Sequence, residues 1–225
     1  MIYKNKKISE HAADLLLRIH AVSFRFNPPY TFTSGIKSPI YLDNRIVMSY
    51  PKERNKIIAF YISVIDEHVG RKNIDCISAT ASAAIPQGAW IAQKLNLPLV
   101  YVRPTSKAYG KGNKLEGHFK KGSRVLIIED HISTAASVIN NAATIRSLGG
   151  KVKYCIAATN YETTLSQKQI RENKIKAYSL TTGKIIVENA LKKAMISKKE
   201  KEIVDLWFSA PSDWGKKMGL DRTYH

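Results

Sequence analysis

The chain has 225 residues, 44 % of them hydrophobic and 24 % charged, which suits one globular domain with a sizeable core. No apolar run approaches the roughly 18 residues that a membrane-spanning helix needs, and the polar, lysine-rich residues 1–9 argue against a secretory signal. The net charge of +18 fits either an anionic ligand or nucleic acid, or a solvated lysine surface. We favour the solvated surface, because the lysines are scattered.

The first predicted element is a helix over residues 9–20, with Ser9 as its N-cap and one apolar face. A stretch rich in proline and aromatic residues follows, in which residues 40–42 resemble a strand. A second helix is predicted over residues 51–69, with Pro51 in its first turn, where proline is tolerated.

Strands and helices then alternate. Strands are predicted at residues 74–78, 98–103, 124–129 and 151–158. Helices are predicted at residues 87–95 and 137–148. Helices of this length between strands predict a parallel sheet with right-handed crossovers. Residues 107–117, rich in glycine, predict a long mobile loop, and the chain beyond about residue 165 predicts a basic helical tail.

Two adjacent carboxylates follow the most apolar strand. Glu129 and Asp130 end the run from Val125, and the residues after them that lead into and begin the next helix supply three hydroxyls: Ser133, Thr134 and Ser137. Ligands of open parallel sheets bind beyond the carboxyl ends of the strands, and a helix N-terminus suits a phosphate. Carboxylates beside such a site suit sugar hydroxyls, so the pattern predicts a sugar phosphate. A plain capped turn is the alternative.

The segment 125–137 resembles the ribose-phosphate signature of type I phosphoribosyltransferases. Further stretches resemble the orotate phosphoribosyltransferases within that family. They are residues 32–45 (FTSGIKSPIYLDNR), residues 80–86 (TASAAIP), residues 101–117 with Arg103, Lys107 and Gly110, and residues 207–214. The signature alone fits several phosphoribosyltransferases, whereas its combination with residues 32–45 is more specific.

The resemblance implies an α/β fold, a central parallel sheet flanked by helices, with a small hood of N-terminal segments to which C-terminal ones can add. We expect one domain over residues 1–225: residues 1–50 mainly hood, residues 70–160 the core, and residues 161–225 a helical region. The implied reaction moves the 5-phosphoribosyl group from 5-phosphoribosyl-1-diphosphate to orotate, giving orotidine 5′-monophosphate and diphosphate in pyrimidine (UMP) biosynthesis.

The resemblance also implies the site residues. Lys107 and Asp130 would be catalytic. The 5-phosphoribosyl-1-diphosphate would meet Arg103, Lys107, Tyr109, Glu129, Asp130, His131, Ile132, Ser133, Thr134, Ala135, Ala136, Ser137, Thr80, Ala81 and Ser82. Orotate would meet Lys37, Tyr41 and Ser133, although Tyr41 also fits plain core packing.

The expected cofactor is Mg²⁺, carried mainly by the diphosphate substrate and only indirectly by Asp130. The expected assembly is a cytoplasmic homodimer in which Lys107 reaches into the neighbouring subunit's site. Cys76 and Cys155 lie in apolar runs and fit buried free thiols in a reducing compartment. We expect no membrane or nucleic-acid partner.

Several positions depart from the family pattern. Alanine stands where glycine is usual at positions 79, 84, 135 and 136, and alanine with a positive φ would cost ~1 kcal/mol or more. Tyr109 replaces a histidine, and His131 replaces an apolar residue, which we interpret as a local packing change rather than a catalytic base. These departures leave two alternatives open: a regulatory or nucleic-acid-binding protein with weak or lost activity, and a phosphoribosyltransferase for another base.

Overall fold

A six-stranded sheet forms the centre of the protein in the computed structural model, which describes residues 6–32, 35–104 and 114–220. Its strands run in the order β10-β9-β8-β5-β6-β7, and all neighbours are parallel except β6 and β7. The strands are β5 (Cys76–Thr80), β6 (Leu99–Val102), β7 (Leu115–Glu116), β8 (Arg124–Ile132), β9 (Lys151–Asn160) and β10 (Lys176–Thr182). The predicted α/β fold with a mostly parallel sheet is confirmed.

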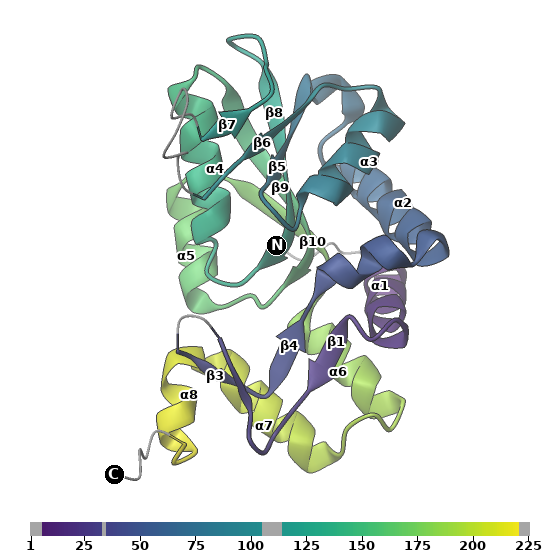
Figure 1. Ribbon diagram of the computed structural model, residues 1–225, viewed down its shortest axis with the longest axis vertical. Helices are drawn as coiled ribbons and strands as arrows, with labels where there is room; N and C mark the ends of the chain where they lie inside the picture. Colours follow the sequence, from purple (N-terminus) through teal and green to yellow (C-terminus); the bar gives the residue numbers. More distant parts are fainter. Residues whose placement is uncertain (1–5, 33–34, 105–113, 221–225) are drawn as a thin grey trace.

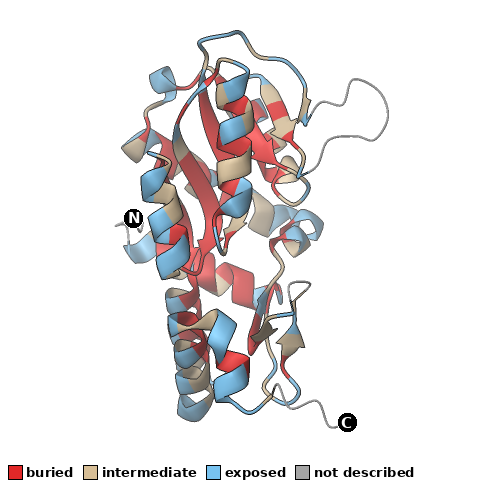
Figure 2. Cartoon of the chain, turned by 90° about the vertical axis from the view of Figure 1, so that its left-hand side faces the viewer, coloured by how far each residue is buried: buried red, intermediate tan, exposed pale blue. Residues whose placement is uncertain are grey.

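Helices cover both faces of this sheet (Figure 1). On one face lie α1 (Lys6–Arg18), α2 (Pro51–His68) and α3 (Ile85–Leu95), with η2 (Arg71–Asn73) leading into β5. On the other lie α4 (Ala136–Ser147) and α5 (Thr164–Glu172). Figure 2 shows the consequence, because the strands are buried while the helices expose their outer sides.

The central strand β8 is apolar on both faces, as a covered parallel strand should be. Leu126 and Ile128 belong to the hydrophobic cluster shared with α1, α2 and α3. Val125 and Ile127 belong to a second cluster, shared with α4. Side chains alternate along a strand, so one strand joins the two cores and leads directly to the two carboxylates.

A smaller hood lies beyond one end of the sheet (Figure 1). Its N-terminal parts are β1 (Val22–Phe24), β2 (Tyr30–Thr31), β3 (Lys37–Ser38), β4 (Ile40–Leu42) and η1 (Asn44–Ser49). Its C-terminal parts are α6 (Gly183–Lys192), α7 (Lys198–Ser209) and α8 (Pro211–Lys217). β1 pairs with β4 and β2 with β3, both antiparallel. The hood therefore combines segments from both halves of the chain.

Several predicted element boundaries differ from the structure, three of them near the sheet or its first helix. The first helix already includes Lys6, so Ser9 is a buried helical residue and not a cap. The strand predicted at residues 74–78 lies two residues later, as β5. The strand predicted at residues 124–129 continues through Asp130 and His131 to Ile132, because His131 pairs with Thr159 of β9.

The tail contains a strand that the sequence pattern missed. β10 (Lys176–Thr182) is the edge strand of the sheet beside β9. Its polar sequence KAYSLTT lacks a long apolar run, although Leu180 is fully buried. Cys76 and Cys155 are buried free thiols, as predicted. Among the described helices, none is long and apolar enough to cross a membrane.

Candidate active site at the carboxyl ends of β5 and β8

Glu129 and Asp130 form the centre of the candidate site at the end of β8. Glu129 is only 3 % exposed, whereas Asp130 is partly open to solvent. One carboxylate oxygen of Glu129, Oε1, accepts the backbone N–H of Asp130 at 3.0 Å. The other, Oε2, is buried without a hydrogen-bond partner among the described residues. This pair is placed to accept donors from a ligand.

The position of these two carboxyl groups makes their ionisation unfavourable. Burial is the main cause that raises the pKa of Glu129 well above its usual value, and the neighbouring Asp130 adds to it. Burial also raises the pKa of Asp130. A buried carboxyl pair with raised pKa values at a strand end is typical of a functional site.

Two side chains that the sequence analysis did not single out fix the backbone of this pair. The hydroxyl of Tyr61, on α2, donates to the carbonyl of Glu129 at 2.9 Å. The amide of Asn44, at the start of η1, donates from Nδ2 to the carbonyl of Asp130 and to Thr159 Oγ1, both at 2.8 Å. Both contacts join residues more than 60 positions apart, so they cannot be predicted from the sequence around either residue.

The loop after β8 turns into α4 at Ala135. Ala135 has φ 70° and ψ 2°, a left-handed conformation, and Ala136 is the first residue of α4. Thr163 Oγ1, at the start of α5, donates to the carbonyl of Ser133 at 3.0 Å and so holds the loop from outside. The N-terminus of α4 has no acidic residue in its first turn. Its free N–H groups and the nearby hydroxyls of this loop suit a phosphate.

A second loop follows the neighbouring strand. β5 ends at Thr80, residues 81–84 form the loop with a cis peptide between Ala81 and Ser82, and α3 begins at Ile85. Because β5 and β8 are paired in parallel, both loops lie at the same edge of the sheet. The structure therefore brings together the predicted groups 80–82 and 129–137.

Three of the four alanines at glycine positions carry no backbone penalty. Ala79 lies within β5, Ala84 has φ −86°, and Ala136 is helical. Only Ala135 adopts a positive φ, where an L side chain costs about 1–2 kcal/mol relative to the right-handed region.

Exchanging the two loop alanines for glycine should separate these cases. We expect Ala135→Gly to be more stable than Ala136→Gly by about 1 kcal/mol. At position 135, glycine removes the strain of a side chain in the left-handed conformation. At position 136, in the helix, glycine only adds conformational freedom to the unfolded chain. Urea unfolding of both variants measures the difference. Equal losses in the two variants would contradict the left-handed conformation of Ala135.

His131 is held in a packed, neutral environment. Its Nδ1 lies 2.8 Å from Thr159 Oγ1, and its ring meets the ring of Tyr161 edge-on, with centroids 4.2 Å apart. Burial lowers the pKa of His131 to about 3. The ring is therefore neutral near pH 7, which fits a packing residue and not a catalytic base.

The lowered pKa of His131 predicts sensitivity to acid. A histidine that is neutral when folded contributes stability that is complete above its unfolded pKa, ~6.5, and is lost as the pH falls toward 3. We expect the wild type to lose up to about 2 kcal/mol more than His131→Gln between pH 7 and pH 5. Urea unfolding at both pH values tests this. Parallel losses in the two proteins would show that the histidine titrates normally.

The predicted base-side residues lie in the hood. Lys37 donates from Nζ to Thr31 Oγ1 at 2.9 Å, and its backbone carbonyl accepts Trp207 Nε1 of α7 at 2.8 Å. Tyr41 is 37 % exposed and not buried in the core. Its ring lies 5.5 Å from Tyr30, centroid to centroid. The ring of Tyr41 is therefore accessible to a ligand.

Aromatic contacts connect this hood segment to the carboxylate strand. The ring centroid of Trp207 lies 6.2 Å from that of Phe32 and 5.0 Å from that of Tyr161. Tyr161 in turn contacts His131, next to Asp130. No hydrogen bond between described residues joins Lys37 or Tyr41 directly to Ser133, whereas the aromatic contacts connect the hood to His131.

Arg103 lies at the edge of the site, and two further predictions fall outside the described residues. The backbone N–H of Arg103 donates to Lys114 O at 2.8 Å, and its guanidinium lies 3.7 Å from Glu116. Lys107 and Tyr109 belong to residues 105–113, outside the described ranges. Their roles stay predictions.

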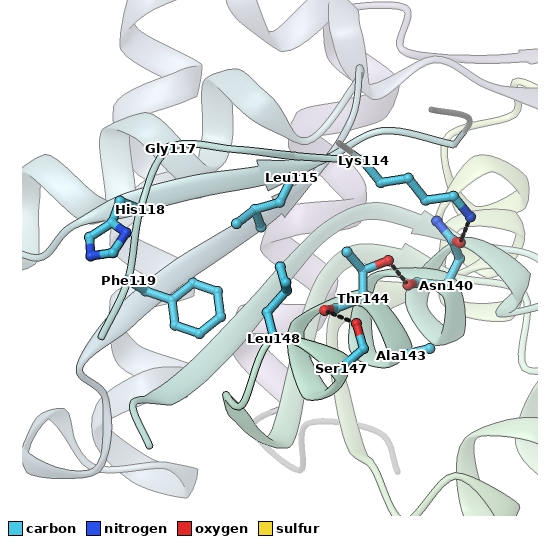
Figure 3. Close-up of a pocket in the computed structure, with 10 residues that line it drawn as sticks. All are labelled: Lys114, Leu115, Gly117, His118, Phe119, Asn140, Ala143, Thr144, Ser147 and Leu148. Atoms are coloured by element: carbon cyan, nitrogen blue, oxygen red, sulfur yellow. Dashed lines mark hydrogen bonds between the residues drawn. The ribbon is translucent and has the colours of Figure 1, made fainter. Parts of the chain in front are cut away.

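A pocket of about 720 Å³ lies between α4 and the segment 114–119 (Figure 3). It is bordered by Lys114, His118 and Phe119 on one side and by Asn140, Thr144 and Leu148 on the other. Figure 3 shows Lys114 Nζ reaching Asn140 Oδ1, at 3.4 Å. None of its lining residues belongs to the loops after β5 and β8, so this pocket is not the candidate site.

Among the described residues, no group of three or more histidine, cysteine or acidic side chains is arranged to hold a metal ion. Glu129 and Asp130 offer only a pair of carboxylates. Mg²⁺ accepts one or two carboxylates when substrate phosphates and water complete its shell. The residues present thus fit an ion that arrives with a phosphorylated ligand.

The chain is similar to curated proteins along most of its length, although no family model matches it. It is 39 % identical over 202 residues to the orotate phosphoribosyltransferase of Coxiella burnetii, which covers 90 % of this chain and 96 % of that protein. It is 37 % identical over 209 residues to the enzyme of the same name from Listeria innocua, which covers 93 % and 99 %.

Solved structures share the fold. A crystal structure of orotate phosphoribosyltransferase from Aeropyrum pernix matches with a TM-score of 0.70 and 24 % identity, over 82 % of this chain and 99 % of that one. The Leishmania donovani UMP synthase matches with a TM-score of 0.74 and 24 % identity, over 89 % of this chain but 42 % of that longer one.

Proposed function

Because this chain belongs to the orotate phosphoribosyltransferase family, we propose that the loops after β5 and β8 hold 5-phosphoribosyl-1-diphosphate for its reaction with orotate. The enzyme transfers the 5-phosphoribosyl group to orotate and releases diphosphate, a step of pyrimidine biosynthesis. The observation that carries the site proposal is the carboxylate pair Glu129–Asp130 directly before a phosphate-suited helix N-terminus.

The loop after β8 would bind the 5-phosphate of the ribose. Its donors are the N–H groups at the start of α4 and the hydroxyls of Ser133, Thr134 and Ser137, of which Thr134 and Ser137 are exposed. Ile132 and Ala135 are buried and shape the turn. The loop 80–82 would bind the diphosphate, together with Arg103 and, by family resemblance, Lys107 and Tyr109.

Glu129 and Asp130 would accept the ribose hydroxyls. As the bond from the anomeric carbon to the diphosphate breaks, the ribose gains positive charge and the diphosphate negative charge. A carboxylate beside the ribose stabilises the first, and Arg103 and Lys107 stabilise the second. The unpaired oxygen of Glu129 is the acceptor that a bound hydroxyl would satisfy.

Orotate would lie between the hood and the end of β8. Lys37 offers a cation for its carboxylate, Tyr41 an exposed ring for its planar face, and Ser133 a hydroxyl. The base nitrogen would then attack the anomeric carbon from the side opposite the diphosphate.

Mg²⁺ bound to the diphosphate would neutralise its growing charge. Asp130 would meet this ion indirectly. We also propose a cytoplasmic homodimer in which Lys107 of one subunit completes its neighbour's site. Measuring the size of the protein in solution would test the dimer. Mixing an inactive Lys107 variant with an inactive Asp130 variant would test the shared site, because mixed dimers should recover activity.

The regulatory alternative has no observation in its favour. Several lysines of the basic tail are in ion pairs: Lys201 with Glu188, Lys192 with Glu10 and Lys193 with Asp14. An alternative base is equally unsupported by the relatives.

The direct experiment mixes the protein with orotate, 5-phosphoribosyl-1-diphosphate and Mg²⁺, and follows the loss of orotate absorbance. Adenine in place of orotate is the matched control. We expect turnover with orotate as the base and none with adenine. A folded protein that consumes no orotate, or one that prefers adenine, would contradict the assignment.

A further inference from the structure

Asn141 of α4 forms a buried link to β5, and these two elements adjoin the two loops that the proposed function uses. Its Oδ1 accepts the hydroxyl of Ser78 at 2.7 Å, and its Nδ2 donates to Thr80 Oγ1 at 3.0 Å. Asn141 and Ser78 are fully buried and Thr80 is 7 % exposed. Asn141 thus joins two polar side chains of β5 inside an otherwise apolar contact between helix and sheet.

The position of this link matters because the sheet no longer holds the two strands together there. The pairing of β5 with β8 ends at Ala79 and Ile128. Thr80 is the next residue of β5 and the last before the loop 81–84. On its other side, β5 remains tied to β6 through Ala81 N–H and Val102 O, at 2.9 Å. The bond from Asn141 to Thr80 is therefore a cross-link beyond the last rung of the ladder.

The other end of the link is the helix that begins at the second loop. Asn141 lies in α4 (Ala136–Ser147), whose N-terminus follows the loop 133–135. Neighbouring residues of the helix, Val138, Ala142 and Ile145, are buried against the same side of the sheet, so apolar packing already attaches the helix. Packing holds two surfaces together without fixing direction, whereas hydrogen bonds are directional.

We propose that Asn141 is a positioning residue that fixes the spacing between the diphosphate loop 81–84 and the ribose-phosphate loop 133–135. This inference rests on the proposed function, because it assumes that one ligand occupies both loops. A ligand that bridges two sub-sites gains affinity only if their spacing matches its own length. A fragment that occupies one sub-site is indifferent to that spacing.

The experiment compares the bridging ligand with its two fragments. Binding of 5-phosphoribosyl-1-diphosphate, inorganic diphosphate and ribose 5-phosphate, each with Mg²⁺, is measured by calorimetry for wild type and Asn141→Leu. We expect Asn141→Leu to bind the bridging ligand about ten-fold more weakly and each fragment within about two-fold of wild type. KM for 5-phosphoribosyl-1-diphosphate should rise in step.

Asn189 supplies a matched control. It is also a buried asparagine, and its Nδ2 donates to Glu10 O at 3.1 Å and to Asp14 Oδ1 at 2.9 Å, between α6 and α1. Asn189→Leu likewise removes two hydrogen bonds of a buried asparagine, here part-buried ones away from both loops. We expect it to lower stability and to leave binding of all three ligands unchanged.

Equal losses for all three ligands, or unchanged binding of the bridging ligand, would overturn the role of Asn141. If Asn141→Leu does not fold, Ser78→Ala removes one of the two bonds with less disturbance, and we expect the same selective loss at about three-fold. A wild type that binds no 5-phosphoribosyl-1-diphosphate would instead contradict the proposed function itself.

Discussion

Replacing Asp130 with asparagine is expected to lower kcat/KM about 10²–10³-fold while leaving the protein folded. The substitution keeps the size of the side chain and removes the charge that, in the proposed function, would face the ribose. Loss of one aligned electrostatic contact to a transition state typically costs this much. The measurement is steady-state kinetics with orotate and 5-phosphoribosyl-1-diphosphate. Asp213→Asn, in an exposed position of α8, is the matched control and should retain full activity.

The same variant should be at least as stable as wild type. Burial raises the pKa of Glu129 and of Asp130. A carboxyl whose pKa is higher in the folded chain than in the unfolded one stabilises the fold below about pH 4 and loses that contribution as the pH rises. Asparagine removes this loss. Reduced activity together with a lower unfolding midpoint at pH 7 would show that Asp130 is structural.

Truncation of Trp207 to alanine is expected to cost about 3–5 kcal/mol and to raise KM for orotate more than KM for 5-phosphoribosyl-1-diphosphate. Trp207 is 1 % exposed, and its ring contacts Phe32, Tyr161 and Phe208. Its N–H also holds the backbone of Lys37. Removal of the ring should therefore release the hood segment that carries the base-side residues.

Trp207→Phe separates packing from the hydrogen bond. Phenylalanine keeps an aromatic ring but cannot donate to Lys37 O, so we expect a smaller loss of about 1–2 kcal/mol and an intermediate KM for orotate. Urea unfolding and initial rates at varied orotate give both quantities. Equal rises in the two KM values would argue that the hood is only a general support.

The core of the sheet could be predicted from the sequence because its signals are local. The run Val125–Ile128 is apolar on both faces, as a covered parallel strand is expected to be, and the helices on either side of it in the sequence favour that interpretation. Pro51 begins α2 as expected, since the first turn has no use for its missing N–H. The adjacent pair Glu129–Asp130 could be located at the end of this strand, where ligands of parallel sheets bind, although the sequence left a plain capped turn as the alternative.

The missed parts depend on contacts between distant residues. β10 buries the polar residues Ser179, Thr181 and Thr182, which give no apolar strand pattern, and its place at the edge beside β9 comes from tertiary pairing. The supports of the site are likewise distant, because Asn44 lies 86 positions from Asp130 and Asn141 lies 61 from Thr80. An asparagine in an ordinary helix pattern carries no sign of the partner that it will meet.

The glycine positions show a further limit of prediction from sequence. Sequence alone could say that four alanines replace glycines, but not which of them has a positive φ. That depends on where α4 begins, and the structure puts the boundary between Ala135 and Ala136. One residue of difference decides whether a methyl group is strained or ordinary.

The bond between Trp207 and Lys37 joins residues 170 positions apart. During synthesis, the chain that carries Lys37 leaves the ribosome long before α7 exists. The sheet residues up to Asn160 can form earlier, since domains tend to fold from the N-terminal side as they emerge. In a nascent chain, the loops proposed to bind the sugar phosphate would thus form before the hood segment proposed to bind orotate is complete. The synthesis of α7 would therefore set the time at which a new molecule can bind orotate.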